Sequence, residues 1–398
     1  QNYNHACIAV WGLSNEITAA SVVNEELLEN HRELNDLCHR MDATRMTTMA
    51  HAFMLEIESP ILEIPDVNSY NLYFGWYLGE LEQNDEFFDE YHEKYPDRVI
   101  GFSEYGADAN PQYQSAHPER SDYTESYQAV YHEHMLKLIA DRPYLWATHV
   151  WNMFDFGADA RAEGGENGQN HKGLMTFDRS YKKDAFYAYK AWLSDDPFVH
   201  LCGKRYVDRV EDVTKVTVYS NLPAVELFAN GVSLGVKEAP DHFFYFDVPN
   251  VGETTLVAKA GELTDESFIR KVDTFNEAYR LVEKNAILNW FDITEPEGYL
   301  SLNSKFSDIM ATVGGKIWAV RLMLMLKKKM DANKTGEDKG EKMNFNFSPK
   351  ALKGMMAMLG GFTVLRMTGM IGMVGVSFTK EDLLALNAQL NKIKAPKK

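Results

Sequence analysis

Three regions with different patterns of apolar and polar positions follow one another along the chain of 398 residues. In residues 1–197, short apolar runs alternate with segments of helical spacing, and this alternation predicts a parallel α/β fold. The runs are almost continuously apolar, as is typical of strands that are covered on both faces. Helices are expected over Asn24–Arg40 and Tyr123–Ala140. The predicted strands are ACIAVW (6–11), RMTTMAHAF (45–53), IPDVNSYNLY (64–73), RVIGFS (98–103) and YLWATHVW (144–151).

A second pattern begins after residue 200. From Val213 to Val272, apolar and polar residues alternate in short segments separated by turns, which predicts a small antiparallel sandwich like one immunoglobulin-like unit. The remaining residues have helical spacing and hold eleven of the eighteen methionines, which we expect mainly in a core. We therefore expect a multidomain α/β plus all-β protein with a barrel part over 1–200, the sandwich over 201–276 and a helical domain over 277–398.

Charge is distributed unevenly along the chain. Residues 301–398 contain 17 Lys and Arg against 7 Asp and Glu, a balance of +10, whereas the rest contains 24 against 51, a balance of −27. So acidic a body argues against a nucleic-acid partner. The basic region either docks against an acidic body, in the same chain or a neighbouring copy, or forms a solvated helical surface. A homo-oligomer is compatible with the first alternative.

The sequence contains no apolar run of the ~20 residues that a membrane helix needs, so no membrane partner is expected. Three cysteines fit neither a disulfide framework nor a metal-ligand spacing, and they favour a reduced, cytoplasmic setting. The first predicted strand begins close to Gln1, so a targeting signal has to be judged on upstream sequence.

Two glutamates follow or end predicted strands. WGLSNE ends in Glu16, and VIGFSEYG presents Glu104. In a parallel barrel, active-site groups lie at the carboxyl ends of the strands, and an unpaired buried carboxylate is costly, so the two together favour catalysis over salt-bridged loop residues. Two carboxyl groups ~5–5.5 Å apart cleave a glycosidic bond with retention, whereas ~6.5–9.5 Å leaves room for water and implies inversion.

These stretches resemble glycoside hydrolase family 2. WGLSNE is similar to the acid/base motif of that family, and SEYG (103–106) is similar to its nucleophile motif. Further segments resemble the family's sixth strand, its eighth strand, its last barrel helix and the β-domain after the barrel: NLYFGWY (71–77), HVWNMFDF (149–156), KGLMTFDRSYKKDAFYAYKAW (172–192) and VELFANGVSLG (225–235). The resemblance implies strands four to eight of a (β/α)8 TIM barrel.

The resemblance also implies a retaining double-displacement mechanism with Glu16 as acid/base and Glu104 as nucleophile. Among the implied substrate-binding residues, Asn15 would bind the 2-hydroxyl of the sugar and Trp151 would line its site. The simpler interpretations are a helix cap for Asn15, and packing for Tyr73 and Trp151. The implied substrate-binding set is Asn15, Asn71, Tyr73, Trp151, Asn170 and Lys172.

The identity of the sugar depends on the segment Asn170-His171-Lys172. In β-glucuronidases of the family, such an N-x-K pair holds the carboxylate of the sugar, and a lysine opposite a uronate is chemically sensible. Similar runs occur in members that look like β-galactosidases, and the flanking residues resemble those more closely. We therefore expect β-galactosidase activity, with β-glucuronidase activity as the alternative.

The resemblance begins at the fourth strand of the barrel, so the chain is expected to be the carboxy-terminal part of a larger enzyme. An open five-stranded sheet would expose an unpaired edge, which leaves the activity of this chain alone undecided. A non-catalytic carbohydrate-binding or assembly module is the competing class, although it would not need both glutamates. No cofactor or metal ligand can be identified, and a magnesium ion is compatible with the full-length enzyme.

Overall fold

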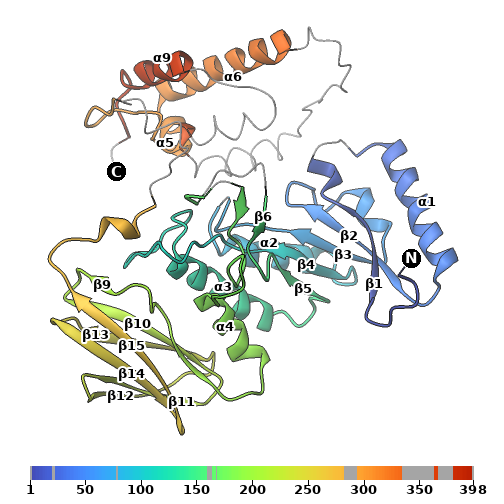
Figure 1. Cartoon of the computed structure of the whole chain (residues 1–398). Coiled ribbons are helices and arrows are strands. Elements are labelled where there is room, and N and C mark those ends of the chain that lie inside the picture. Colours follow the sequence, from blue (N-terminus) through green and yellow to red (C-terminus); the bar gives the residue numbers. More distant parts are fainter. Residues whose placement is uncertain are drawn as a thin grey trace. The chain divides into compact units, whose positions relative to one another are not determined.

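A computed structural model describes residues 2–19, 23–77, 79–158, 164–166, 168–281, 294–333, 363–365 and 380–396 (Figure 1). The chain forms two compact units, and each is discontinuous in sequence. The first unit comprises residues 1–14, 38–53 and 65–283, and the second comprises 15–37, 54–64 and 284–398.

The five predicted α/β strands form one sheet with the spatial order β1-β2-β3-β4-β5 (Figure 1). The pairs β2–β3, β3–β4 and β4–β5 are parallel, as the sequence predicted. All five residues of β3 are buried, whereas those of β1 at one end of the order are half-buried or exposed. The strands are β1 (Val10–Asn15), β2 (Met46–Ala52), β3 (Val67–Asn71), β4 (Ile100–Tyr105) and β5 (Thr148–Val150).

The first strand begins later than predicted, at Val10 instead of residue 6. Arg45 explains the difference, because its guanidinium donates to the carbonyl oxygens of His5 at 3.1 Å and Ile8 at 2.8 Å. These carbonyls are satisfied by a side chain rather than by a neighbouring strand. The shift places the end of β1 at Asn15, directly before Glu16.

Helices α1 (Glu25–Met41), α2 (Gln83–Lys94), α3 (Glu125–Ala140) and α4 (Asp184–Leu193) connect or follow these strands, and α1 and α3 confirm the predicted helices. Thr124 caps α3, since its hydroxyl accepts the N–H of Tyr127 at 3.0 Å. Nine residues of α3 are buried, so this helix is covered on much of its circumference.

Two facing sheets form the β-sandwich, which confirms the second predicted region. Their orders are β13-β10-β8 and β12-β11-β14-β15-β9, and the pairs are antiparallel except for β15–β9. Asn230 and Gly231 form the two-residue turn between β11 and β12, where both have positive φ as a primed hairpin turn requires. The strands are β8 (Val199–Leu201), β9 (Asp208–Arg209), β10 (Val213–Ser220), β11 (Ala224–Ala229), β12 (Val232–Glu238), β13 (Phe243–Pro249), β14 (Glu253–Ala260) and β15 (Leu263–Lys271).

The sandwich packs directly on helices α3 and α4, as Figure 1 shows. The carboxylate of Glu133 on α3 accepts the hydroxyls of Tyr219 and Tyr245, each at 2.6 Å. This contact lies beside an apolar cluster from both parts of the first unit, so helices α3 and α4 share one core with the sandwich. The buried members of the cluster are Leu136, Ala188, Ala191, Phe198, Tyr219 and Phe243.

In the second unit, the described part of the carboxy-terminal region is helical, as predicted. Its helices are α5 (Phe306–Met310), α6 (Val313–Asn333) and α9 (Lys380–Leu390). Trp318 on α6 is buried, and its indole N–H donates to Leu386 O on α9 at 3.3 Å. The methionines after Met330 lie outside the described residues. No helix in the described ranges is long and apolar enough to span a membrane. Short 3-10 turns occur at Ile17–Ala19, Pro60–Glu63 and Glu277–Tyr279, and β6 (Phe156–Gly157) pairs with β7 (Gln169–Asn170) in the first unit.

Candidate active site

Glu104 lies near the carboxyl end of β4, where its backbone is in register with Asn71 on β3. The hydroxyl of Tyr73 donates to Oε2 of Glu104 at 2.7 Å. Burial of the phenol and the neighbouring Glu104 charge both raise the pKa of Tyr73. The phenol therefore keeps its proton and acts as a donor, which stabilises Glu104 as a carboxylate.

Other residues around the end of β4 form hydrogen bonds with their neighbours, and binding of a substrate by Asn71 stays a prediction. Asn71 is fully buried, and its amide oxygen accepts the hydroxyl of Ser103 at 2.6 Å. Tyr105 accepts the hydroxyl of Tyr189 at 3.1 Å, and burial raises the pKa of Tyr105 to about 12. Because successive residues of a strand point to opposite faces, Tyr105 packs in the core while Glu104 remains half-buried.

Lys172 is completely buried beside the tyrosine that binds Glu104. Its ammonium donates to Oδ2 of Asp108 and to the hydroxyl of Tyr77. The nitrogen lies 4.3 Å from the ring centroid of Tyr77, 5.7 Å from that of Tyr73 and 5.9 Å from that of Trp76. The Tyr73 and Tyr77 rings are themselves 5.1 Å apart. A continuous cluster therefore joins Glu104, Tyr73, Tyr77, Lys172 and Asp108, and we call these five residues the Glu104–Lys172 cluster.

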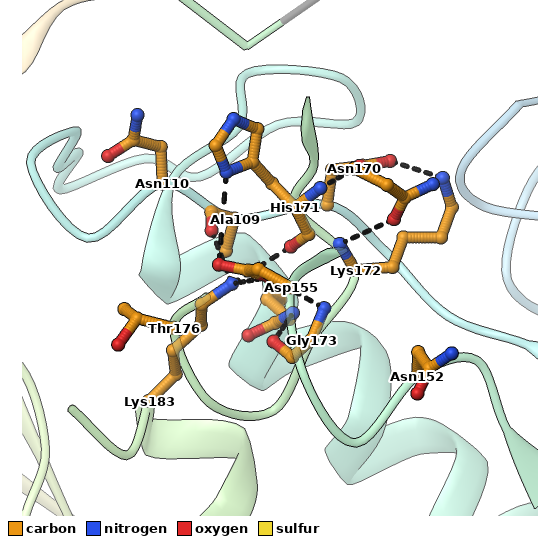
Figure 2. Close-up of polar contacts among 12 residues, drawn as sticks. Ala109, Asn110, Asn152, Asp155, Asn170, His171, Lys172, Gly173, Thr176 and Lys183 are labelled. Carbon is orange, nitrogen blue, oxygen red and sulfur yellow. Dashed lines mark hydrogen bonds and ion pairs between the residues drawn. The ribbon is translucent and has the colours of Figure 1, made fainter. Parts of the chain in front are cut away.

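Asn170 bonds to the backbone of the lysine segment, and its contact with a substrate stays a prediction. It is buried at the end of β7, and its side-chain oxygen accepts the N–H of Lys172 at 3.0 Å (Figure 2). The turn from Asn170 to Lys172 is thereby closed by a local side-chain hydrogen bond.

Trp151 follows β5 directly, and its backbone N–H donates to Tyr105 O at 2.8 Å. Its indole is half-buried and lies edge-on to Phe156, with ring centroids 5.7 Å apart. A methyl group added to Gly106 would stand 2.2 Å from the carbonyl oxygen of Trp151, so only glycine permits this close approach of the two segments. The peptide bond between Trp151 and Asn152 is cis. Whether this tryptophan forms a sugar platform stays a prediction.

A second buried lysine, Lys183, connects the same loops (Figure 2). Its ammonium donates to Ala109 O at 2.6 Å, Oδ1 of Asp155 at 2.8 Å and His171 O at 2.9 Å. Oδ1 of Asp155 also accepts the N–H of Gly173 at 2.8 Å. Burial lowers the pKa of Lys183, and the charge of Asp155 opposes this effect. Figure 2 shows this arrangement holding the Asn170–Gly173 segment against residues 109–110.

Asn15 and Glu16 belong to the second compact unit, unlike the Glu104–Lys172 cluster. Asn15 ends β1 and is exposed. Glu16 is half-buried and has a φ of 51°, an uncommon backbone conformation for a residue with a side chain. Glu16 does follow a strand of the sheet, as the sequence predicted, but its pairing with Glu104 stays a prediction.

Asp108 and Tyr77 are site residues that the sequence analysis missed. Tyr77 ends the NLYFGWY segment, and Asp108 lies two residues after the SEYG motif. What singles them out is contact with Lys172, and that contact depends on the fold rather than on residue spacing.

Within the described residues, one group of side chains has the composition and proximity of a metal site: Asp184, His200 and Cys202. Both oxygens of Asp184 already accept hydrogen bonds, from His200 Nε2 at 2.8 Å and from the N–H of Gly203 at 2.7 Å. Burial also raises the pKa of the Cys202 thiol, and a thiol binds metal as the thiolate. We therefore interpret this group as a structural connection between α4 and β8.

Comparisons with known proteins agree on one family. The model of the glycosyl hydrolases family 2 TIM barrel domain matches residues 1–194, and a domain of unknown function (DUF4982) matches residues 211–264. A β-glucuronidase of Bacteroides fragilis is 39% identical over 280 residues, which are 69% of this chain and 38% of that protein. This chain therefore spans little more than a third of that relative.

Solved structures give the same result. The FMN-binding β-glucuronidase from Facaelibacterium prausnitzii L2-6 is 45% identical, with a TM-score of 0.69 over 71% of this chain and 44% of that one. A putative β-galactosidase from Bacteroides fragilis is 32% identical, with a TM-score of 0.63 over 68% of this chain and 42% of that one. The parallel sheet, the sandwich after it and these matches have one explanation: the chain belongs to glycoside hydrolase family 2, with its TIM barrel domain matched over residues 1–194.

Proposed function

We propose that the protein carrying this chain is a retaining β-glucuronidase, with Glu104 as nucleophile and Glu16 as acid/base. The observation that carries this proposal is the Glu104–Lys172 cluster, in which a lysine ammonium is connected to the nucleophile through Tyr73 and Tyr77. A glucuronide differs from a galactoside by a carboxylate in place of the C6 hydroxymethyl group and by the opposite configuration at C4. A fixed cation beside the reacting sugar is the group that recognises the carboxylate.

The reaction follows from the chemistry of two carboxyl groups. The carboxylate of Glu104 attacks the anomeric carbon and forms a glycosyl ester, while the bond to the departing oxygen breaks and Glu16 gives that oxygen a proton. Glu16 then takes a proton from water, and the resulting attack on the ester releases the sugar and restores Glu104. The hydroxyl of Tyr73 keeps Glu104 ionised and aligned before the first step.

The names of the relatives support the same choice. Two of the three relatives described above are named β-glucuronidases, including the two with the higher identities. The residues that flank Lys172 favoured β-galactosidase, and these comparisons favour the reverse order. Flanking residues are a weak guide here, because the charge that separates the two substrates is recognised by a single ammonium group.

The decisive experiment compares 4-nitrophenyl β-D-glucuronide with 4-nitrophenyl β-D-galactoside as substrates of the protein at its full natural length. We expect kcat/KM to be at least about 100-fold higher for the glucuronide, the size of effect that one charge-assisted contact provides. Faster turnover of the galactoside would overturn the substrate assignment, and inversion at the anomeric carbon would overturn the mechanism.

A further inference from the structure

Asp108 contacts two consecutive residues of the lysine segment with its two carboxylate oxygens. Oδ1 accepts the backbone N–H of His171 at 3.0 Å, and Oδ2 accepts the ammonium of Lys172. The backbone next to Asp108 also bonds to His171, because the N–H of Ala109 donates to His171 O at 2.9 Å. Asp108 is buried, with 1% of its surface exposed. This carboxylate therefore fixes both the peptide that carries Lys172 and the end of its side chain.

A lysine ammonium lies at the end of a flexible four-carbon chain, so it has no fixed position unless its surroundings define one. The rings around Lys172 attract a cation but do not set the direction of its N–H bonds. Direction comes from the two acceptors, Asp108 and Tyr77. Among the described residues, these are the two acceptors of the ammonium, which has three N–H bonds. One N–H therefore remains for a ligand.

We propose that Asp108 is the positioning residue that aims Lys172 at the carboxylate of a uronic acid. This inference rests on the proposed glucuronidase function and adds a specificity determinant to it. Asp108 lies four residues after Glu104. One short stretch of backbone therefore places both the proposed nucleophile and the carboxylate that pairs with Lys172. The distance from nucleophile to cation is thereby set within the first unit, by rigid neighbours of β4.

Asp155 is the matched control, because it is also a buried aspartate paired with a buried lysine. Its partner Lys183 has a full set of three acceptors, two of which are main-chain carbonyls. That lysine has no N–H left over for a ligand. Removal of the charge of Asp155 should weaken the fold without changing which sugar is preferred.

The test measures kcat and KM of the full-length protein and its Asp108→Asn and Asp155→Asn variants with both nitrophenyl glycosides. An amide offers one acceptor oxygen instead of two, so the His171 N–H and the Lys172 ammonium must compete for it. We expect Asp108→Asn to lower kcat/KM about 100-fold for the glucuronide, the effect of a misplaced binding group, and less than about threefold for the galactoside. Asp155→Asn should change both values by the same factor.

Equal losses for the two substrates with Asp108→Asn would overturn the inference, because Asp108 would then support the fold only. A crystal structure of the Asp108→Asn variant adds a measurement that does not depend on activity, namely the position of Lys172 Nζ. An unmoved ammonium would overturn the inference even if the wild type is a glucuronidase. A displaced ammonium in a protein that prefers galactosides would support the positioning role and overturn the proposed substrate.

Discussion

Lys172 and Lys183 are both completely buried, yet the acceptors around their ammonium groups differ in kind. Lys183 donates to two main-chain carbonyls and one carboxylate, which use all its N–H bonds. Lys172 donates to one carboxylate and one phenol, and three aromatic rings lie within 6 Å of its ammonium. Both ammonium groups are compensated by an aspartate, as burial of a charge requires.

If Lys172 binds substrate as proposed, burial and ion pairing alone do not mark a functional lysine. The informative feature is the type of acceptor. Main-chain carbonyls hold a cation permanently because they belong to the fold. A phenol hydroxyl is a neutral acceptor, and a substrate carboxylate forms a stronger hydrogen bond with the ammonium than the phenol does. The Glu104–Lys172 cluster should therefore respond to mutation in activity, and the Lys183 contacts should respond in stability.

The largest expected effect is that of Glu104→Gln. The amide cannot attack the anomeric carbon, so we expect kcat to fall at least about 10⁴-fold for both glycosides, as when other covalent catalysts lose their nucleophile. Nitrophenol release under saturating substrate measures it, and an unchanged circular dichroism spectrum shows that the variant is folded. Residual turnover within tenfold of wild type would mean that another group is the nucleophile.

Lys183→Met should have the next largest effect, on stability. The variant leaves Asp155 buried without its cation, and the loss of one partner of a buried ion pair costs about 3–5 kcal/mol. Urea unfolding measures this loss as a lower transition midpoint. The ratio of glucuronide to galactoside turnover per folded molecule should not change, and a shift in that ratio would contradict the structural role of Lys183.

Lys172→Met tests the other side of the comparison. It also removes the cation of a buried ion pair, and this cation is the one proposed to bind the uronate. We expect kcat/KM to fall about 100-fold for the glucuronide and less than about threefold for the galactoside, after correction for the folded fraction. Parallel losses for the two sugars would make Lys172 equivalent to Lys183.

The sequence predicted the parts of this arrangement that depend on local pattern. The apolar runs gave the sheet, and the positions of Glu16 and Glu104 next to strand ends followed from them. The start of β1 was wrong, because Arg45, distant in sequence, satisfies the carbonyls of residues 5 and 8. Local pattern contains no information about such a contact.

Asp108 and Tyr77 show the same limit within the site. Each meets Lys172 only because three loops converge at the ends of the strands, so sequence spacing could not identify them. Lys183 is the converse case. A lysine at the start of a helix would be expected to lie in solvent, and its complete burial depends on carbonyls contributed by two other segments.

Tyr73→Phe sharpens the comparison by removing one hydroxyl while leaving the ring beside Lys172 in place. Glu104 loses a hydrogen bond of 2.7 Å, and a bond to a charged group contributes about 1.5–3 kcal/mol. We expect kcat/KM to fall about 10–100-fold by the same factor for both sugars, since the change acts on the nucleophile. A loss confined to the glucuronide would instead assign the hydroxyl to substrate recognition.

The last prediction concerns Glu125, a carboxyl group that accepts a tyrosine hydroxyl as Glu104 does. Tyr181 donates to its Oε1 at 3.1 Å, and the N–H of Asp184 donates to the same oxygen at 2.9 Å. Burial, with the nearby Asp184 charge as the second cause, raises the pKa of Glu125 to about 8.

The folded protein thus binds a proton at Glu125 at pH values where an unfolded glutamate, with a pKa of about 4.3, has lost it. The stability that this proton provides is fully present below about pH 4.3 and is lost as the pH rises through 8. Glu125→Gln is neutral at every pH, so the free energy of unfolding of the wild type, measured in urea between pH 5 and 8, should fall relative to that of the variant by up to about 1.4 kcal/mol per pH unit. Parallel curves would mean that Glu125 is ionised in the folded state, and that a carboxylate can be held at the start of α3 by hydrogen bonds alone, as Tyr73 is proposed to help hold Glu104.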